Sequence, residues 1–476
     1  MIRVFQQFVP KRKLLLILSE GLLLVGAVFV GTSIPLIAQR DVFEATPSEL
    51  WRGLVSSLTV AALCQVSLSY NDLYDWRVSR NRLDLPNRLL HAAGFTLLTL
   101  AVIVFFVPWV FYFPGLPNLH GQTLKLVLIL GASFIGLYYW RIGFHWFFFK
   151  WGFGERILLL GTGQQALSLG KEIQERPETG FEVAGCVGVD KPENTDEANT
   201  LYLGKPDELA ALTTKHRISR VIVALEQRRG ALPVDQLLAC RLNGVRVEER
   251  EALYEKIHGK LSIDSLRPSY LIFGEGFRKS RLQLGAKRTC DILLALVGLV
   301  IGLPLILVVA IAIRIDSRGP IFFRQRRTGL DGRSFTCLKF RSMRVDAEKH
   351  TGPVWALHTD DRITKVGRFI RKTRLDELPQ MLNVLIGEMS WVGPRPERPV
   401  FVQQLSKEIP YYMERLSMRP GLTGWAQINY PYGASADDAK EKLMYDLYYI
   451  KNLRLLFDAT ILLRTVKVVL FGRGAR

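Results

Sequence analysis

Four apolar stretches of membrane length dominate the first third of this 476-residue chain. A helix of about 20 apolar residues can cross the hydrocarbon core of a bilayer, because it satisfies its backbone hydrogen bonds internally. The hydrophobic content of 49% is also high for a protein that is soluble throughout. We therefore predict a transmembrane domain of four helices over residues 1–150, formed by Leu14–Ile37, Leu50–Tyr70, Leu89–Phe113 and Leu124–Trp140.

Basic residues next to these stretches predict their orientation. Lys11–Lys13 precede the first stretch, and a loop with four arginines, over 77–88, follows the second. The loop Pro114–Gly121 contains no lysine or arginine. Since cytoplasmic loops carry the excess of Lys and Arg, both termini are predicted to be cytoplasmic. The first stretch is too long for a cleaved signal peptide.

Glu20 lies inside the first stretch, near its cytoplasmic end. A carboxylate within a membrane is unfavourable unless it has a partner. We expect Glu20 to pair with a neighbouring helix rather than to act in function.

The pattern changes after Glu155, where short β-rich runs alternate with helical runs. This alternation predicts a small parallel sheet, which we assign to a Rossmann-like α/β domain over residues 151–275. The turn Gly161–Ala166 fits the GxGxxA form of a dinucleotide fingerprint. Asp190 lies farther along than a ribose-binding carboxylate usually does, so a structural or regulatory role is favoured over turnover of a nicotinamide cofactor. The predicted strands are Arg156–Leu160, Phe181–Val189, Arg220–Leu225 and Val245–Glu248, and the predicted helices are Ala166–Glu175, Asp207–His216 and Val234–Leu242.

Two adjacent carboxylates, Asp376 and Glu377, follow a cluster of cations. An aspartate of ordinary pKa, near 3.9, is ionised at neutral pH and can attack phosphorus without a general base. A diphosphate repels this carboxylate by about 4 kcal/mol per pair of unit charges at roughly 4 Å, so cations must lie close by. Glu377 is suited to hold a Mg²⁺ ion that bridges substrate oxygens. The cations near in sequence are Arg368, Arg371, Lys372, Arg374 and Arg395.

A fifth apolar run, Ile292–Ile313, is long enough to cross the membrane but is predicted not to. Pro304 lies within the run, where it removes a backbone hydrogen bond and kinks a helix. Basic residues flank the run on both sides, and a crossing would carry Asp376 away from nucleotide-activated substrates. We therefore predict a bent re-entrant helix over 287–314 that enters and leaves on the cytoplasmic face.

The last apolar segment, Tyr445–Leu470, mixes leucines with lysines and arginines. Such a mixture is typical of an amphipathic helix at a membrane surface. Ordinary packing in a protein core explains it almost as well.

Charge and cysteine content limit the partners of the chain. The 63 Lys and Arg exceed the 44 Asp and Glu, which gives a net charge of +19. No nucleic-acid motif accompanies this charge, so we assign it to lipid headgroups and diphosphates. The five cysteines form no CxxC pair and are expected to be reduced thiols.

Four motifs lie in the last part of the chain: Lys339–Met343, Leu375–Gln380, Gly393–Pro396 and Arg419–Gln427. Together they resemble the motifs of the bacterial polyprenyl-phosphate sugar-1-phosphate transferases. The four apolar stretches and the α/β segment resemble the large form of this family, in which they precede an α-rich monotopic catalytic domain, here 276–476. Glu397–Pro399 and Asn429–Gly433 also resemble the group linked to exosortase-type exopolysaccharide systems.

The resemblance implies a two-step transfer at the bacterial inner membrane, on its cytoplasmic side. Asp376 would attack the sugar-linked phosphorus of a UDP-sugar, with glucose or galactose expected, and UMP would leave. Undecaprenyl phosphate would then take the phosphosugar from the enzyme. The resemblance is compatible with a homodimer. It implies Asp376 and Glu377 as catalytic residues, Glu377 as the Mg²⁺ ligand, and Lys339, Arg341, Arg371, Arg395 and Arg419 as residues that bind phosphates or the nucleotide-sugar.

The chain departs from the family pattern at the predicted kink. The family often has a serine directly before the kinking proline, whereas Leu303 precedes Pro304 here. No hydroxyl is available at that position to cap the freed carbonyl, and Gly302 is the residue that supplies backbone freedom instead.

Three other interpretations remain open from the sequence. A nucleotide-sugar dehydratase or epimerase would need a second dinucleotide fold with a Tyr-x-x-x-Lys pair, but Tyr254 and Tyr445 have no lysine four residues on. A noncatalytic scaffold for polysaccharide assembly would keep its function after Asp376→Asn. Asp376 could also be a helix N-cap with Glu377 in the first turn, in which case the cations nearby would be ordinary surface residues.

Overall fold

The structure is a computed structural model. It describes residues 2–4, 7–38, 47–75, 84–107, 109, 111–113, 123–150, 154–190, 202–225, 232–266, 268–274, 276–345, 362–431, 433 and 435–470. The chain divides into two compact units. The first contains residues 1–2 and 9–247, and the second contains residues 3–8 and 248–476. The second unit therefore begins within the range that the sequence analysis assigns to the α/β domain.

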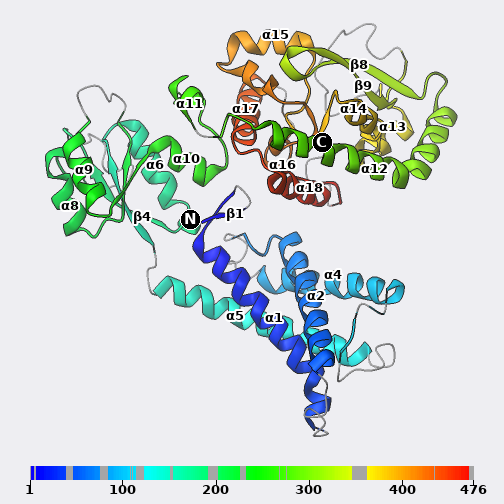
Figure 1. Ribbon diagram of the computed structural model, residues 1–476, viewed down its shortest axis with the longest axis horizontal. Helices are drawn as coiled ribbons and strands as arrows, with labels where there is room; N and C mark the ends of the chain where they lie inside the picture. The colour runs from blue at the N-terminus through cyan, green and yellow to red at the C-terminus, as the bar shows by residue number, and fades with distance from the viewer. Residues whose placement is uncertain are drawn as a thin grey trace. The chain divides into compact units, whose positions relative to one another are not determined.

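The chain begins with a two-stranded ladder of β1 (Ile2–Val4) and β2 (Gln7–Val9), of which residues 3–8 belong to the second unit. Four long helices of the first unit follow it. Figure 1 draws these helices in blue to cyan, and each packs against two of the others. They share a core of fully buried side chains such as Leu24 and Leu137, while others such as Leu22 and Phe105 are largely exposed. Exposed apolar faces of this extent suit contact with lipid. The prediction of four apolar N-terminal helices is confirmed as α1 (Lys11–Ala38), α2 (Pro47–Tyr70), α4 (Leu85–Phe106) and α5 (Thr123–Lys150).

The predicted end of the third apolar stretch is wrong. Helix α4 ends at Phe106, not at Phe113. Val107, which precedes Pro108 in the sequence, already has nonhelical φ and ψ angles of −138° and 58°. A proline disfavours the helical conformation of the residue before it, which explains the earlier end.

The fourth helix is longer than predicted because a buried charge lies inside it. Helix α5 continues past Trp140, and Arg141 donates to Glu20 Oε2 at 2.8 Å and to the Leu73 carbonyl oxygen at 2.6 Å. Both charged side chains are fully buried. The prediction that Glu20 pairs with a neighbouring helix is confirmed, because Arg141 belongs to α5 and Glu20 to α1.

The α/β part of the first unit is a five-stranded sheet of order β5-β4-β3-β6-β7. Strand β3 pairs in parallel with β4 and β6, and β4 pairs in parallel with β5. The predicted Rossmann-like sheet is thus confirmed, although β5 was missed because it has only three residues. The strands are β3 (Glu155–Leu160), β4 (Phe181–Val187), β5 (Tyr202–Gly204), β6 (Arg220–Val223) and β7 (Arg246–Glu249), and the helices are α6 (Gln164–Gln174), α8 (Leu209–Lys215) and α9 (Val234–Leu242).

Packing accounts for the first glycine of the fingerprint. Gly161 has a φ of +138°, and a Cβ atom there would lie 2.6 Å from the Ala224 carbonyl oxygen. Only glycine fits this turn between β3 and α6. The first glycine of the motif is therefore explained by the close approach of two backbones.

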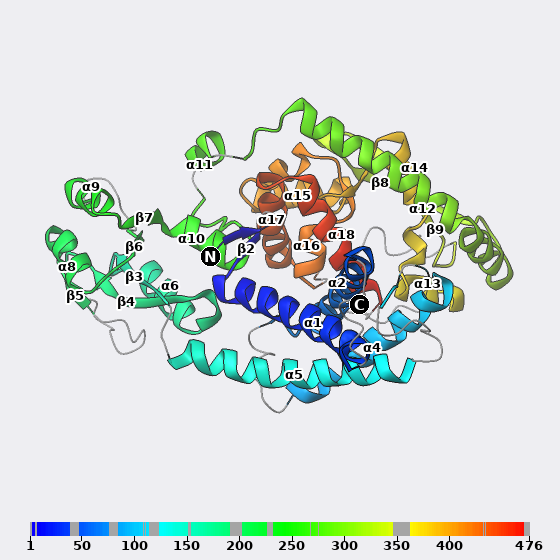
Figure 2. The same ribbon diagram turned by 60° about the horizontal axis from the view of Figure 1, so that its bottom comes forward.

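Helices predominate in the second unit, as predicted (Figures 1 and 2). Its core contains the buried rings of Trp425, Tyr448, Tyr449 and Phe457. Two short sheets, β8 with β9 and β10 with β11, connect the helices. The elements are α10 (Arg250–His258), α11 (Pro268–Phe273), α12 (Arg281–Asp316), β8 (Phe322–Thr328), β9 (Ser334–Phe340), α13 (Lys365–Lys372), α14 (Gln380–Ile386), β10 (Ser390–Val392), α15 (Pro399–Glu408), β11 (Gly421–Thr423), α16 (Trp425–Asn429), α17 (Ala436–Lys451) and α18 (Leu455–Leu470).

Helix α12 contains the fifth apolar run. Together with the four N-terminal helices, it makes five helices in the described residues that are long and apolar enough to cross a membrane. Ser280 caps its first turn through a capping box with Gln283. The helix continues through Pro304, and its ribbon changes direction along its length (Figures 1 and 2).

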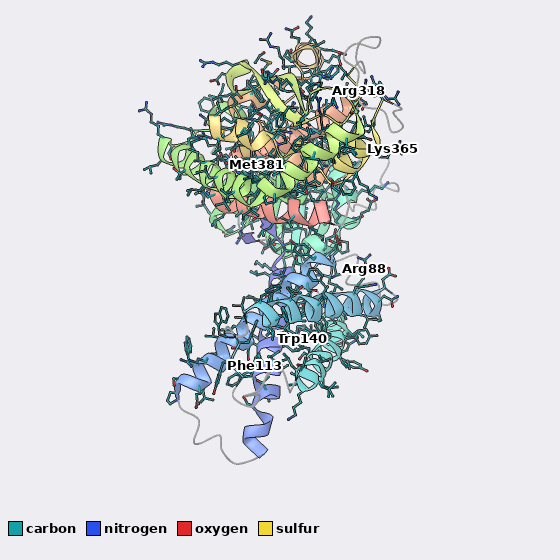
Figure 3. All side chains as sticks on the ribbon, turned by 90° about the vertical axis from the view of Figure 1, so that its right-hand side faces the viewer. Arg88, Phe113, Trp140, Arg318, Lys365 and Met381 are labelled. Carbon is teal, nitrogen blue, oxygen red and sulfur yellow. The ribbon has the colours of Figure 1, made fainter. Side chains whose placement is uncertain are left out.

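Both halves of α12 pack against the same unit. In the first half, Gly298 leaves room for Met381, whose Sδ atom would be 3.1 Å from a Cβ atom at that glycine. Met381, labelled in Figure 3, belongs to α14. In the second half, Ile313 is buried against β9 and α13, and Asp316 accepts a hydrogen bond from the Val366 amide at 3.1 Å. A straight helix that crossed a bilayer could not keep both ends on one globular body. This packing favours the predicted re-entrant path, which stays a prediction.

The segment Tyr445–Leu470 is not one helix but parts of two. Helix α17 ends at Lys451, and Asn452 donates to the Tyr448 carbonyl oxygen at 3.0 Å. Helix α18 buries Phe457 and exposes Leu463 at 65%. Core packing explains α17, whereas α18 has the amphipathic character expected at a membrane surface.

Candidate active site

The two adjacent carboxylates lie on a short turn between α13 and α14. Asp376 and Glu377 belong to a 3₁₀ turn, η6 (Leu375–Glu377). Helix α14 begins at Gln380 after Pro379, and no side chain caps it. The interpretation of Asp376 as a helix N-cap is therefore wrong. Arg374, just before the turn, has a φ of +57°, a conformation that non-glycine residues rarely adopt and that is common near functional sites.

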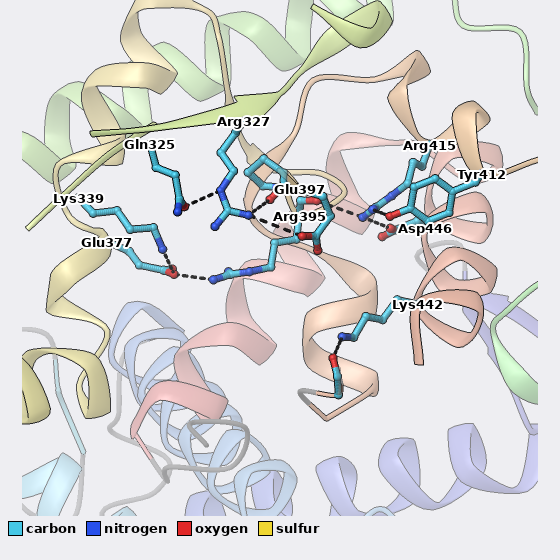
Figure 4. A network of polar contacts seen from close by, with 12 residues as sticks. Gln325, Arg327, Lys339, Glu377, Arg395, Glu397, Tyr412, Arg415, Lys442 and Asp446 are labelled. Carbon is cyan, nitrogen blue, oxygen red and sulfur yellow. Dashed lines mark hydrogen bonds and ion pairs between the residues drawn. The ribbon is translucent and has the colours of Figure 1, made fainter. Parts of the chain in front are cut away.

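Two cations hold the Glu377 carboxylate. Its Oε1 atom accepts from Lys339 Nζ at 3.1 Å and from Arg395 Nη2 at 2.9 Å (Figure 4). The Glu377 side chain is only 11% exposed. Burial opposes ionisation of this carboxyl, but the charges of Lys339, Arg395 and Arg374 outweigh burial and hold its pKa well below its ordinary range. Glu377 is thus a fixed negative charge.

The Asp376 carboxylate, in contrast, is not bound by any cation in the described part of the chain. It has no hydrogen bond or ion pair with any residue that the structure describes. Burial is the largest cause that raises its pKa above the ordinary value, and the charge of Glu377 adds to it. The surrounding cations, Lys339, Arg395 and Arg371, act in the opposite direction. The sequence analysis assumed an ordinary pKa for Asp376. Because burial and Glu377 raise this pKa, the cations contribute more to keeping Asp376 ionised than that assumption implies.

The β8–β9 hairpin places Lys339 at the site. Lys339 lies opposite Phe323, and Cys337 lies opposite Gln325, so Gln325, Arg327 and Lys339 share one face of the hairpin. Arg327 donates to Gln325 Oε1 at 2.9 Å and to the Pro396 carbonyl oxygen at 3.0 Å. This face of the hairpin therefore carries both Lys339, which binds Glu377, and Arg327, which binds the Gly393–Pro396 loop.

That loop packs against the Arg419–Gln427 motif through backbone contacts. Strand β10 pairs in parallel with β11, and the Gly393 amide donates to the Thr423 carbonyl oxygen at 2.9 Å. A Cβ atom at Gly393 would lie 2.4 Å from the Arg419 carbonyl oxygen, so no side chain fits there. Two motifs far apart in sequence are thus brought into direct contact.

The buried ion pair between Arg415 and Asp446 contacts the backbone of Arg395. Arg415 donates to the Arg395 carbonyl oxygen at 3.0 Å, to the Tyr412 hydroxyl at 2.7 Å and to Asp446 Oδ2 at 2.8 Å (Figure 4). Burial raises the pKa of Asp446 to about 6, against the opposing charge of Arg415. Arg327, Arg415 and Asp446 were not predicted as site residues from the sequence. The one available signal was Asp446 itself, a carboxylate between the apolar residues Leu443 and Leu447 of α17.

The structure brings together only part of the predicted site. Asp376, Glu377, Lys339 and Arg395 are assembled, and Arg371 is near enough to affect the pKa of Asp376. Arg341 instead donates to the Ser317 and Arg318 carbonyl oxygens after α12, at 2.7 and 3.1 Å. Arg419 donates to the Gly387 carbonyl oxygen at 2.9 Å. These contacts stabilise local structure, and the phosphate-binding roles of both arginines stay predictions.

Fold and site together define a class: a membrane protein in which an apolar helix lies beside a pair of carboxylates held among cations. Residues 282–472 match the family model described as bacterial sugar transferase, and residues 69–245 match the one described as CoA-binding domain.

Curated relatives agree with this class. The chain is 41% identical over 275 residues to the UDP-N-acetylgalactosamine-undecaprenyl-phosphate N-acetylgalactosaminephosphotransferase of Aeromonas hydrophila, an alignment that covers 58% of this chain and 63% of that protein. It is 33% identical over 336 residues to the UDP-glucose:undecaprenyl-phosphate glucose-1-phosphate transferase of Xanthomonas campestris pv. campestris, which covers 67% of this chain and 68% of that protein. The protein of that name from Escherichia coli (strain K12) is 32% identical over 335 residues, with 68% and 70% covered. The chain belongs to the bacterial sugar transferase family. Its membership of the exosortase-linked group stays a prediction.

Proposed function

We propose that the protein transfers a sugar 1-phosphate from a UDP-sugar to undecaprenyl phosphate and so begins the synthesis of a lipid-linked glycan or exopolysaccharide. The observation that carries this proposal is the contrast between the two carboxylates. Glu377 is fixed by Lys339 and Arg395, whereas Asp376, next to it, has no partner among the described residues. A carboxylate that has no hydrogen-bond partner of its own but lies near several cations is suited to act as a nucleophile on an anionic substrate. The names of the relatives support both substrates.

The reaction proceeds in two displacements at one phosphorus. An Asp376 oxygen forms a bond to the sugar-linked phosphorus, and the bond from that phosphorus to the bridging oxygen breaks, so UMP leaves with that oxygen. A phosphate oxygen of undecaprenyl phosphate then attacks the same phosphorus, and the bond to Asp376 breaks. The products are undecaprenyl-diphosphate-sugar and the free aspartate.

Cations around Asp376 lower the barrier in both steps. Lys339 and Arg395 bind Glu377 of the acid pair, and their charges and that of Arg371 act on Asp376. They attract the diphosphate and stabilise the charge that spreads over the transferring phosphoryl group. Because the site binds sugar hydroxyls through contacts that no motif specifies, both glucose and N-acetylated hexoses are candidates.

The donor set fits a Mg²⁺ ion. Glu377 Oε2 accepts no hydrogen bond from the described residues, and Mg²⁺ usually binds one or two carboxylates together with substrate phosphates. Glu377 would hold the ion, with Asp376 beside it. When bound, Mg²⁺ neutralises charge on the diphosphate and makes its phosphorus a better electrophile.

A cytoplasmic location suits both substrates. UDP-sugars are made in the cytoplasm, and the basic residues near the N-terminal helices favour cytoplasmic termini. The re-entrant path of α12 would keep the site on that side. The exposed apolar face of the helix would then lie in the inner leaflet, where the acceptor lipid is embedded.

A trapping experiment tests the proposal. The purified full chain is incubated with Mg²⁺ and UDP-sugars labelled in the sugar, namely UDP-glucose, UDP-galactose and UDP-N-acetylgalactosamine, without undecaprenyl phosphate. We expect one UDP-sugar to release UMP and to leave the labelled sugar on the polypeptide, and undecaprenyl phosphate to remove the label. Turnover with acceptor but no labelled protein at any time would refute the covalent route. Failure of the whole panel to release UMP would refute the proposed activity.

A further inference from the structure

A cavity in the second unit lies apart from the candidate active site. Its volume is about 340 Å³, within the range of small-molecule sites. It is bounded by α10, α11, the first turn of α12, and the turn between α17 and α18, and none of its lining residues belongs to the Asp376–Glu377 site. We call it the α12 cavity, and the lining residues that matter here are Glu255, Arg278, Lys279, Gln283, Lys451 and Arg454.

Cations dominate this cavity. Five lysines and arginines line it, against one carboxylate, Glu255. Two of the five have acidic partners: Lys451 lies 2.6 Å from Glu255, and Lys256 lies 2.7 Å from Glu248. The other three are Arg278, Lys279 and Arg454.

These three cations have no acidic partner in the described part of the chain. Lys279 donates to the carbonyl oxygens of Gly276 and, at 3.1 Å, Lys451. The guanidinium groups of Arg278 and Arg454 make no hydrogen bond or ion pair with the described residues. Burial, together with the nearby charge of Arg454, lowers the pKa of Lys279 to about 8. Arg278 and Arg454 are exposed and Lys279 is half-buried. Three cations that line one cavity without acidic partners favour an anion between them.

Exposed apolar side chains are the sequence neighbours of three residues that line the cavity. Phe273 precedes the lining residue Gly274 and is 82% exposed. Leu282 precedes Gln283 and is 84% exposed, and Leu455 follows Arg454 and is 41% exposed. The two helices that start at the cavity, α12 and α18, both continue with exposed apolar faces. Apolar side chains around a cationic cavity match the boundary between lipid headgroups and acyl chains.

We propose that the α12 cavity binds the phosphate of an anionic phospholipid, whose acyl chains lie along the exposed faces of α12 and α18. Arg278, Lys279 and Arg454 contact the phosphate. The ligand chemistry is a phosphate ester with net negative charge, and a soluble phosphate ester is the other source of that chemistry. The apolar surroundings favour the lipid, because a soluble ester would leave these side chains in water.

Native mass spectrometry of the purified full chain in detergent tests this site without any turnover. The probes are phosphatidylglycerol, phosphatidylcholine and sn-glycerol 3-phosphate. The variant is R278A/R454A, and the matched control is R241A/R333A, which removes two exposed arginines elsewhere. We expect the wild type and the control to retain phosphatidylglycerol in preference to phosphatidylcholine, and R278A/R454A to bind it about tenfold or more weakly, because two charge-assisted contacts are lost.

Three results would overturn the proposal. Binding of phosphatidylglycerol that R278A/R454A weakens no more than the control would exclude this cavity as the site. Equal retention of the two phospholipids would exclude an anionic headgroup. Displacement of phosphatidylglycerol by an equal concentration of sn-glycerol 3-phosphate would assign the cavity to a soluble ester instead. If R278A/R454A unfolds, it is replaced by two variants: R278K/R454K, which keeps both positive charges, and R278Q/R454Q, which removes them. The proposal then requires that R278K/R454K binds phosphatidylglycerol and R278Q/R454Q does not, whatever their unfolding temperatures.

Discussion

Replacing Arg415 by methionine tests whether a buried ion pair supports the active-site arginine. Arg415 and Asp446 lie 2.8 Å apart with side chains only 6% and 2% exposed. Methionine keeps most of the volume but leaves Asp446 without its cation. Removing one partner of a buried pair typically destabilises a protein by about 3–5 kcal/mol. The second unit has 235 residues (3–8 and 248–476), and for a unit of that size the loss corresponds to a fall of about 6 °C or more in the unfolding temperature.

The pH dependence of this loss has a definite sign. Burial already raises the pKa of Asp446 to about 6 with Arg415 in place, and the pKa rises further once that charge is gone. The folded protein then binds a proton that the unfolded chain releases near pH 4, so stability falls as pH rises from there through the folded pKa. Each pH unit across this window is worth about 1.4 kcal/mol. The stability of R415M is therefore expected to be closest to that of the wild type near pH 5.5, and the loss of stability is expected to be largest near pH 8.

Thermal unfolding of the purified full chain at these two pH values measures the effect. R333M, which removes an exposed arginine on the β8–β9 turn, is the matched control and should shift by less than about 2 °C. Because Arg415 also binds the Arg395 carbonyl oxygen, UMP release by folded R415M should fall by about tenfold or more. An unfolding temperature within 1 °C of wild type at both pH values would refute the energetic argument. Full activity in a destabilised R415M would refute the support of Arg395.

Three further changes examine the site and its topology. Asp376→Asn should reduce UMP release by at least about 10³-fold and abolish labelling of the protein, with Asp437→Asn, an exposed carboxylate, as control; retained activity would favour the scaffold interpretation. Lys339→Met removes one of the two cations on Glu377 and should lower kcat/KM by about 10²-fold, and chelation of Mg²⁺ should stop turnover reversibly without changing the unfolding temperature. A reporter fused after Arg318 should be cytoplasmic, and an external location would refute the re-entrant helix.

The long helices could be predicted because a single local feature, the length of an apolar run, indicates each of them. A long apolar run has few structures open to it in a membrane protein, so the four N-terminal helices and α12 follow from length alone. Their ends do not. Arg141 looks like the end of a span, yet it lies inside α5 because Glu20, on another helix, offers it a partner. The signal for that boundary is in the tertiary contact and not in the neighbouring sequence.

The same reasoning separates the site residues that could be found from those that could not. Asp376, Glu377 and Arg395 stand in short motifs whose residue types indicate phosphate chemistry. Arg415 and Asp446 are 31 residues apart, and although Asp446 stands between apolar residues, nothing in the sequence pairs it with Arg415. Their role arises only because folding buries both together. Arg341 shows the converse, since a motif residue predicted to bind phosphate is engaged with the carbonyl oxygens after α12.

The apolar helix and the acid pair are parts of one packed arrangement. Val309 and Ile313 of α12 are buried against Phe340, the residue after Lys339, and Ile370 of α13. Leu375 and Leu378, which flank the acid pair, pack on the same cluster. One face of α12 therefore fixes the position of Asp376 and its cations, while its other face presents exposed apolar residues to lipid. A packed core changes shape little, so the depth at which α12 lies in the membrane also sets the distance between Asp376 and the phosphate of a lipid acceptor.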